Sequence, residues 1–212
     1  QRVVVTWEVA DDDSFRTVVK QGRATAAPEL SYSVHADVDG LAPDRWYHYR
    51  FRSGGATSQV GRLRTAPSAT AQTPLRFAVA SCQHYEQGLY TAYAHLAREE
   101  LDLVTHLGDY IYEGAPIPGR VRQHVGLELR TLDDYRRRYA LYKTDPAIQK
   151  MHLHCPWILT WDDHEVDNNY ANDVPEDTQP RDAFLERRAN AYQAYYEHMP
   201  LRMASLPHGS SM

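Results

Sequence analysis

An eleven-residue stretch, Thr160–Tyr170, concentrates side chains that can bind a cation. It holds four acids, one histidine and two adjacent asparagines, and it directly follows the apolar run Trp157–Leu159. Burying an unpaired carboxylate costs several kcal/mol, so folding alone does not explain so many acids at the end of a strand. The stretch therefore predicts a cation site at a strand end.

Two other strand-like runs also end in residues that bind metals. The mostly apolar run Leu75–Ser81 is followed by Cys82. The run Leu101–Leu107 is followed, after one glycine, by Asp109 and then by Tyr112. In open α/β sheets, ligands bind in the crevice at the carboxyl ends of the strands. We therefore expect these two strand ends and the acidic stretch to converge on one site.

The donor types in this predicted site indicate two kinds of ion. A tyrosine binds metal only after its phenol loses a proton, which requires a strongly Lewis-acidic ion such as ferric iron. Tyr112 would meet that ion, and Cys82 would add a thiolate to it. A calcium-type ion prefers carboxylate and amide oxygens, such as those of Asp163. Three neighbours have two open interpretations, calcium ligand or hydrogen-bond partner in the loop: Asp162, Asn168 and Asn169.

Strand-like and helix-like segments alternate from Leu75 onward, as expected of an α/β domain. The expected strands are Leu75–Ser81, Leu101–Leu107 and Ile158–Trp161. The expected helices span Gly88–Glu100 and Asp133–Tyr142, begin at the capping pair Asp145-Pro146, and run from Pro180 to about Pro200. This alternation predicts parallel strands covered by helices.

Residues 1–66 instead show the two-residue periodicity of antiparallel strands. The expected strands are Val3–Val9, Ser31–Val38, Trp46–Arg52 and Gln59–Thr65. They predict an all-β sandwich, and Gly40–Pro43 followed by Trp46–Arg50 resembles the strand-turn-strand signature of fibronectin III-like domains. No residue in it indicates chemistry, so we assign it a structural or spacing role. Residues 67–74, rich in Pro, Ser, Thr and Ala, are the expected linker to a second domain over 75–212.

Composition argues against several classes of function. A formal net charge of -5 offers no basic face for nucleic acid. No apolar run approaches the roughly eighteen residues that a transmembrane helix needs. The two cysteines, Cys82 and Cys155, are too few for a disulfide-stabilised scaffold. These observations favour an ordinary globular protein of one large or two small domains.

Some candidate residues also have interpretations without chemistry. Cys82 could be a small buried apolar residue, the usual state of a free cysteine, and we expect this for Cys155. His152, His154 and Cys155 have a zinc-like spacing but no fourth ligand nearby, so a structural zinc protein is a minor alternative. Other expectations are a place beside the metal ligands for His84, a core position for His106, and a solvated helix face for Arg136, Arg137 and Arg138.

Four segments together resemble one enzyme family. They are Ser81-Cys82-Gln83, Gly108-Asp109-Tyr110-Ile111-Tyr112-Glu113, the stretch Trp161–Tyr170 with its Asp-Asp-His-Glu block, and Met199-Pro200-Leu201-Arg202. These segments resemble the PhoD-type alkaline phosphatases and phosphodiesterases of the metallophosphoesterase superfamily, a group that includes PhoD-like phospholipase D enzymes. The resemblance covers essentially the whole chain.

The resemblance implies a fold and a metal site. The fold would be a β-sandwich followed by an αββα metallophosphoesterase domain, of which this chain carries the N-terminal half. The cofactors would be Fe3+ and Ca2+, with other divalent metals as alternatives. Cys82, Asp109 and Tyr112 would be iron ligands, with Asp109 also bridging to calcium. Asp163 corresponds to a metal-binding Asn of related enzymes, and His164 to the His that contacts the phosphate.

The resemblance also implies a secreted hydrolase of phosphoric esters that uses two cations to activate water. His164 would be its catalytic and substrate-binding residue. Related enzymes take further metal ligands from a downstream segment, so we expect the C-terminal remainder of the enzyme as a partner, in the same or a separate chain. A phospholipase D-like hydrolase of phospholipid head groups is the alternative within this class. A non-catalytic binding module with a degenerate phosphoesterase fold is the alternative outside it.

Overall fold

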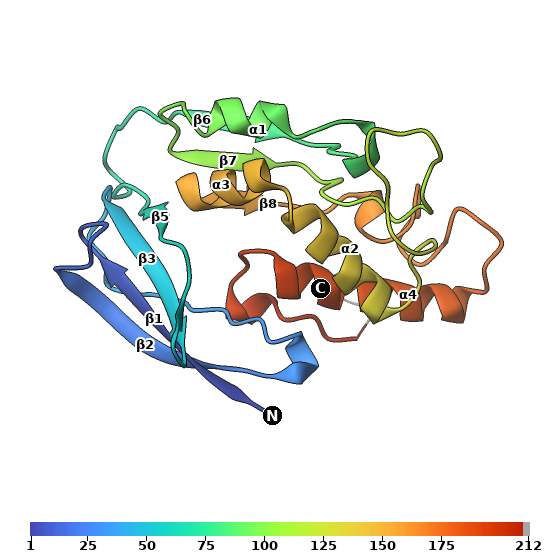
Figure 1. Cartoon of the computed structure of the whole chain (residues 1–212), viewed down its shortest axis with the longest axis horizontal. Helices are drawn as coiled ribbons and strands as arrows, with labels where there is room; N and C mark the ends of the chain where they lie inside the picture. The colour runs from blue at the N-terminus through green and yellow to red at the C-terminus, as the bar shows by residue number, and fades with distance from the viewer. Residues whose placement is uncertain (210–212) are drawn as a thin grey trace.

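Each half of the chain contributes one β-sheet, and the long helices belong to the C-terminal half (Figure 1). The computed structural model describes residues 1–209. The N-terminal sheet lies at the left of Figure 1, and the second sheet runs between helices in its upper part. None of the helices within residues 1–209 combines the length and the apolar character that a membrane span requires.

The N-terminal sheet is antiparallel. Its strands are β1 (Val3–Ala10), β2 (Val18–Ala26), β3 (Trp46–Ser53), β4 (Ala56–Thr57) and β5 (Gly61–Arg64), with a 3-10 helix, η1 (Pro28–Leu30), after β2. β1 lies between β2 and β3, while β4 and β5 pair with the two ends of β3. A small set of side chains is buried in this half: Val9, Ala10, Phe15, Ala26 and Tyr47.

The predicted strand over Ser31–Val38 is wrong. Ser31 and Tyr32 have φ of 51° and 60°, left-handed values that interrupt an extended strand. The segment then packs against the C-terminal half, where the His35 ring stacks on Tyr196 with centroids 4.2 Å apart. β1 pairs with β3 on one side and, on the other, with β2, a strand that the sequence did not predict.

The predicted fibronectin III-like sandwich is not confirmed. The strands of residues 1–66 hydrogen-bond into one five-stranded sheet, and the described residues of this half form no second sheet. A sandwich needs two packed sheets. The N-terminal half is therefore β-rich, but its strands form a single layer.

The C-terminal half contains a parallel sheet in the order β6–β7–β8, as the alternation of segments predicted. Its strands are β6 (Phe77–Ala80), β7 (Leu103–His106) and β8 (Trp157–Leu159). The helices are α1 (Thr91–Leu96), α2 (Leu132–Lys143), α3 (Pro146–His154) and α4 (Arg181–His198), with 3-10 helices η2 (Tyr85–Gln87), η3 (Asp163–Glu165) and η4 (Met203–Ser205). A four-layered αββα arrangement needs a second sheet, so that part of the fold stays a prediction.

Short sequence signals set the starts of two helices. Thr131 and Asp134 form a reciprocal capping box at α2, each side chain accepting the other's backbone N–H. Asp145 caps α3 by accepting the Ala147 N–H at 2.8 Å, with Pro146 in the first turn. By contrast, α1 has no side-chain cap, and it is shorter than the predicted Gly88–Glu100.

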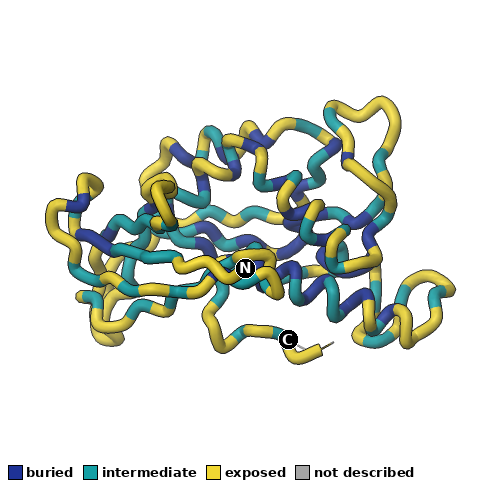
Figure 2. The backbone as a smooth tube through the Cα atoms, turned by 60° about the horizontal axis from the view of Figure 1, so that its bottom comes forward, coloured by how far each residue is buried: buried dark blue, intermediate teal, exposed yellow. Residues whose placement is uncertain are grey.

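Buried tyrosines dominate the C-terminal core, which appears as dark blue segments in Figure 2. Tyr110, Tyr135, Tyr139 and Tyr142 are fully buried, and Cys155 lies among them as expected. His106 is also fully buried, as predicted. The core therefore combines apolar packing with many hydroxyl groups that need hydrogen-bond partners.

The predicted solvated face of Arg136, Arg137 and Arg138 is wrong for two of the three arginines. Arg138 is 1% exposed and donates to the carbonyl of Gly114 at 3.1 Å. Arg136 forms an ion pair with the buried Glu197 of α4 at 2.6 Å. Only Arg137 of the three is largely exposed. The run therefore joins α2 to its neighbours.

One face of the parallel sheet stays open in the described part of the chain. Val104 of β7 is fully buried on the helix-covered face. On the other face, Val79, Thr105 and Ile158 are neighbours across the three strands. Val79 is 58% exposed and Ile158 is 60% exposed. Val79 and Ile158 therefore leave apolar surface exposed on this face.

Candidate metal centre

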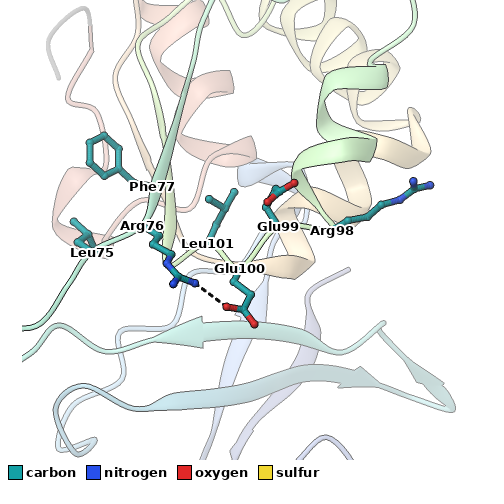
Figure 3. Close-up of a pocket in the computed structure, with 7 residues that line it drawn as sticks. All are labelled: Leu75, Arg76, Phe77, Arg98, Glu99, Glu100 and Leu101. Carbon is teal, nitrogen blue, oxygen red and sulfur yellow. Dashed lines mark hydrogen bonds and ion pairs between the residues drawn. The ribbon is translucent and has the colours of Figure 1, made fainter.

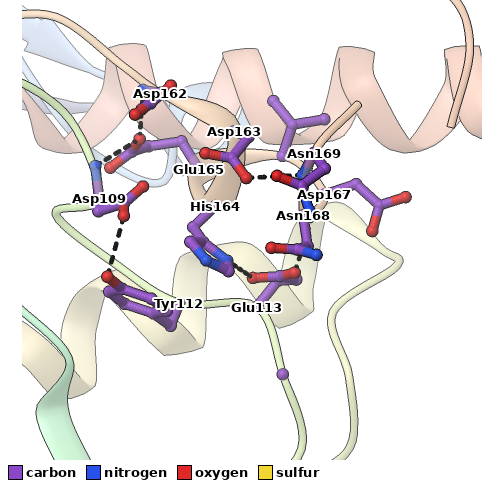
Figure 4. A network of polar contacts seen from close by, with 12 residues as sticks. Asp109, Tyr112, Glu113, Asp162, Asp163, His164, Glu165, Asp167, Asn168 and Asn169 are labelled. Carbon is purple, nitrogen blue, oxygen red and sulfur yellow. Dashed lines mark hydrogen bonds and ion pairs between the residues drawn. The ribbon is translucent and has the colours of Figure 1, made fainter. Parts of the chain in front are cut away.

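Three carboxylates meet at the carboxyl ends of β7 and β8. Asp109, Asp162 and Asp163 each offer an oxygen, and these atoms all lie within 4.8 Å of one another. Figure 4 shows Asp109 opposite the loop that carries the other two acids. The predicted convergence of three strand ends is thus confirmed for two of them, those that carry Asp109 and the acidic stretch. Carboxylates this close repel each other, which favours a bound cation between them.

Backbone geometry brings Asp109 close to Asp162. Gly108 has φ of 105°, and a Cβ there would lie 2.4 Å from the Asp162 Cβ. Only glycine allows this approach, because any side chain would collide with Asp162. Asp109 itself has φ of 56°, a left-handed value that is uncommon for a non-glycine residue. This strained strand exit brings the Asp109 carboxylate close to Asp162.

Glu165 ties the two strand ends together. Its buried carboxylate accepts the backbone N–H of Asp109 at 3.0 Å, that of Asp162 at 2.7 Å, and that of Tyr110. Burial raises the pKa of Glu165 to about 7, against the opposing effect of these N–H donors. Glu165 therefore serves as the scaffold of the site, and its hydrogen bonds explain its burial without a cation.

The carboxylate of Asp167 is also paired with protein groups. Its Oδ1 lies 2.8 Å from Nη1 of the buried Arg187 on α4, and its Oδ2 accepts the Gln179 side-chain N–H at 2.6 Å. Two of the four acids in Thr160–Tyr170 thus pair with protein groups. The negative charge that favours a bound cation is therefore that of Asp162, Asp163 and their neighbour Asp109.

Asp109 and Tyr112 are placed together as predicted. The Tyr112 hydroxyl donates to Asp109 Oδ2 at 2.9 Å, while Asp109 Oδ1 is buried without a hydrogen-bond partner in the described residues. Burial, and next the hydrogen bond to Asp109, raise the pKa of the Tyr112 phenol. An orphaned buried carboxylate oxygen beside a phenol fits a cation whose charge would satisfy one and ionise the other.

Cys82 lies at the edge of this group. Its φ is 55°, and its backbone N–H donates to the Gly108 carbonyl at 3.2 Å, which holds it beside the Asp109 turn. The residue is exposed, so it is not the small buried apolar residue of the alternative interpretation. Its charge contributes to the raised pKa of Tyr112, so the two side chains are near neighbours. Cys82 is not part of the carboxylate cluster itself.

His164 faces the same site and is held by Glu113. Its Nδ1 lies 2.7 Å from Glu113 Oε2, and its ring packs on Tyr112 with centroids 4.1 Å apart (Figure 4). Burial lowers the pKa of His164, but the bond and charge of Glu113, with the charges of Asp109 and Asp163, outweigh it and raise the pKa to about 9. The sequence analysis missed Glu113, although it closes the Gly108–Glu113 motif.

Asn168 and Asn169 border the carboxylates. The Asn169 backbone N–H donates to Asp163 Oδ2 at 2.6 Å. The side-chain N–H of each asparagine donates to Glu176, at 2.8 Å for Asn169. Their amide oxygens are thus directed away from Glu176, so both open interpretations, loop hydrogen bonding and cation binding, are compatible with the geometry.

A second cluster, His84, Glu86 and His124, lies next to Tyr112 and is poorly suited to a cation. The His84 ring packs on Tyr112 at 4.3 Å, so it lies beside the site as expected. The guanidinium of Arg138 lies 2.9 Å from His124 Nδ1. Burial, and next the Arg138 charge, lower the pKa of His124 to about 4. The cluster is better explained as a buried hydrogen-bond network.

The zinc-like trio does not form a cluster within residues 1–209. His152 stacks on Trp157 at 4.0 Å and its Nε2 contacts the Tyr110 hydroxyl at 2.9 Å. His154 Nε2 contacts the backbone carbonyl of Glu99 at 2.9 Å, while Cys155 is buried in the core. The structure therefore gives the structural zinc alternative no support.

A hollow of about 670 Å³ lies elsewhere, near the amino ends of the parallel strands (Figure 3). Arg76 and Glu100 form an ion pair across it at 2.7 Å. Because the candidate metal ligands lie at the opposite, carboxyl ends of the same strands, this hollow is separate from the candidate site.

Comparisons with known proteins place the chain in a family. The family model described as PhoD-like phosphatase matches residues 77–211, and the model for the N-terminal domain of PhoD-like phosphatase matches residues 1–67. The chain is 54% identical to alkaline phosphatase D of Bacillus subtilis (strain 168), over 100% of this chain and 37% of that protein.

A solved structure described as the structure of PhoD is also similar. It matches with a TM-score of 0.97 and 54% sequence identity, over 100% of this chain and 42% of the solved one. The chain thus spans less than half the length of either relative. On these matches, the chain belongs to the PhoD-like phosphatase family.

Proposed function

We propose that the chain carries the metal-binding strand ends of a metal-dependent phosphoric ester hydrolase. The observation that carries this proposal is the convergence of Asp109, Asp162 and Asp163, with Asp109 Oδ1 buried and unpartnered among the described residues. The 54% identity to a protein named alkaline phosphatase D supports the reaction class.

Each predicted ligand has a part in this proposal. Cys82, Asp109 and Tyr112 would hold a ferric-type ion, because they combine thiolate, carboxylate and phenolate donors. Asp109 would also reach a calcium-type ion held by Asp163, with three supporting residues nearby: Asp162, Asn168 and Asn169. Such a pair of cations supplies charge neutralisation at the phosphoryl oxygens and an activated water.

His164 would act on the substrate directly. Its imidazole lies beside the carboxylate cluster, and its hydrogen bond and charge contact with Glu113 favour the protonated form. A protonated imidazole donates a hydrogen bond to a phosphoryl oxygen or a proton to the leaving alcohol.

The proposal extends to the whole enzyme. We infer a structural N-terminal domain over 1–66, a linker over 67–74 and a catalytic domain from 75 onward, completed to an αββα fold by further polypeptide. That polypeptide would supply the remaining metal ligands. Secretion belongs to the same proposal, since it rests on resemblance to secreted enzymes.

An activity assay tests the reaction class. The full-length polypeptide, loaded with iron and calcium, should hydrolyse nitrophenyl phosphate or bis-nitrophenyl phosphate. Release of the head group from phosphatidylcholine instead would favour the phospholipase D-like alternative. A folded, metal-loaded protein that hydrolyses none of the three esters would favour the non-catalytic binding module.

Metal identity is tested by the variant Tyr112→Phe. Phenolate bound to ferric iron absorbs visible light, so the wild-type protein should be coloured and Tyr112→Phe should lose that band. Tyr32→Phe is a matched control, because Tyr32 is 50% exposed in the N-terminal half. An iron-loaded protein whose visible spectrum is unchanged by Tyr112→Phe would remove Tyr112 from the ligands.

A further inference from the structure

We propose that Glu113 is a positioning residue that holds the His164 imidazole so that its Nε2 atom faces the substrate phosphoryl group. This inference rests on the proposed phosphoesterase function, because it assigns a role within that same site.

The contacts of Glu113 leave its carboxylate little freedom. The residue is 6% exposed. Its Oε2 lies 2.7 Å from His164 Nδ1, and its Oε1 accepts the Asn168 backbone N–H at 3.0 Å. Its own carbonyl accepts the Leu129 N–H at 3.0 Å. Both carboxylate oxygens and the backbone are thus engaged, so the side chain is a rigid support for the histidine.

The His164 ring is held at one edge and on one face. Nδ1–H donates to Glu113, and the Tyr112 ring covers a face at a centroid distance of 4.1 Å. Within residues 1–209, Nε2 makes no hydrogen bond, and the side chain is 23% exposed. A carboxylate on one ring nitrogen sets the orientation and the protonation site of the other. Nε2 is therefore the atom left for a substrate oxygen.

Two other buried glutamates make contacts of a different kind. Glu165 accepts only backbone N–H groups, including that of Asp162. Glu86 accepts the backbone N–H groups of Ile117 and His124, both at 3.0 Å. These two glutamates hold loops, whereas Glu113 hydrogen-bonds a side chain of the candidate site.

Removing the charge at position 113 distinguishes a residue that positions His164 from a residue that only holds the loop. A glutamine at position 113 keeps the size of the side chain and an oxygen for the Asn168 N–H. It loses the negative charge that strengthens the hydrogen bond from the imidazole Nδ1–H. A residue needed only for the loop would therefore tolerate glutamine, and a residue that positions His164 would not.

The test is a double-mutant cycle in the full-length, metal-loaded enzyme. Glu113→Gln should lower kcat by about 10–100-fold and change KM less than about threefold. In a His164→Gln background, the same change should have almost no further effect, because Glu113 acts through the ring. Glu113→Asp, which restores the charge, should recover part of kcat. Glu100→Gln, at an 89% exposed glutamate in an ion pair with Arg76, is the matched control.

A second readout does not need activity. In protein labelled with 15N-histidine, the His164 Nδ1 proton is identified by its absence from His164→Gln. It should resonate downfield in the wild type and in Glu100→Gln, and shift or broaden in Glu113→Gln. An unchanged proton, or effects of Glu113→Gln and His164→Gln that multiply, would overturn the proposal. If the wild type hydrolyses no ester, the proposed function fails and the NMR result alone decides whether Glu113 holds the ring.

Discussion

Acids with two different tasks share the stretch Thr160–Tyr170, and their contacts separate them. Glu165 accepts backbone N–H groups and Asp167 pairs with Arg187 at 2.8 Å, so both are satisfied by the protein. Asp162 and Asp163 instead converge with Asp109 within 4.8 Å. At this scale, composition shows that acids are concentrated, and only contacts show which of them converge as candidate metal ligands.

The burial of His106 predicts how the free energy of unfolding depends on pH. Burial lowers the pKa of His106 to about 4, against 6.5 for an unperturbed histidine. As the pH falls below 6.5 the unfolded chain binds this proton first, so stability falls until His106 itself titrates near pH 4. The expected loss from this group between pH 8 and pH 5 is about 2 kcal/mol. Urea denaturation at the two pH values measures it.

The variant His106→Gln isolates that contribution. Its difference in unfolding free energy between pH 8 and pH 5 should be smaller than that of the wild type by about 2 kcal/mol. His95→Gln is the control, because His95 is exposed on α1. If both variants keep the wild-type pH dependence, His106 is not the group that titrates.

Strand exits are the elements that build the site. β6 ends before Cys82, β7 before Asp109 and β8 before the acidic stretch, and the parallel order places all three exits at one edge of the sheet. Cys82 and Asp109 both have positive φ, so the two exits turn in a strained way. The turn at Asp109 brings its carboxylate to those of Asp162 and Asp163, while Cys82 lies at the edge of this group.

Gly108→Ala should break this arrangement. The new Cβ would lie 2.4 Å from the Asp162 Cβ at a φ of 105°. We expect a loss of roughly 2–5 kcal/mol in the free energy of unfolding, from backbone strain and overpacking together. Metal content should fall with it, because Asp109 would move away from Asp162.

Gly114→Ala provides the control for that experiment. No heavy atom outside its immediate neighbours lies within 4 Å of a Cβ placed there. Its effect on urea denaturation should stay within about 0.5 kcal/mol. Equal stability and equal metal content for both alanine variants would show that the close approach of Gly108 to Asp162 is not required.

For the whole molecule, the most unusual feature is the open face of the parallel sheet, where apolar side chains are exposed. Val79 and Ile158 are more than half exposed there, whereas Val104 and Trp157 on the other face are buried. Strands of parallel sheets are normally buried on both faces. Since the chain covers 37% of the B. subtilis relative, we expect further polypeptide to cover this face.

Ile158→Asp tests that expectation in the full-length polypeptide. Placing a charge on a covered face should cost more than about 2 kcal/mol, because the carboxylate would be desolvated without a partner. Val125→Asp, at a loop residue that is 76% exposed, should cost much less. Similar melting temperatures for the two variants would mean that the sheet face stays open to solvent.

Local signals made much of the fold predictable. The capping box of Thr131 and Asp134, and the Asp145-Pro146 pair, place the starts of α2 and α3 through contacts within a few residues. In Ser31–Val38, the alternation of polar and apolar side chains is compatible with a strand, but the structure has no strand there. The stacking of His35 on Tyr196, a residue distant in the sequence, overrides that local pattern.

By itself, the sequence determined the family, the alternation of strands and helices, and the residues that could bind metal, because these depend on residue type and short-range spacing. Only the tertiary structure separated the acids that hold the loops from those that converge. It also paired Glu113 with His164, which lie 51 residues apart, and Glu165 with Asp109, which lie 56 residues apart. Such contacts form only when strand exits meet in space, so no local pattern contains them.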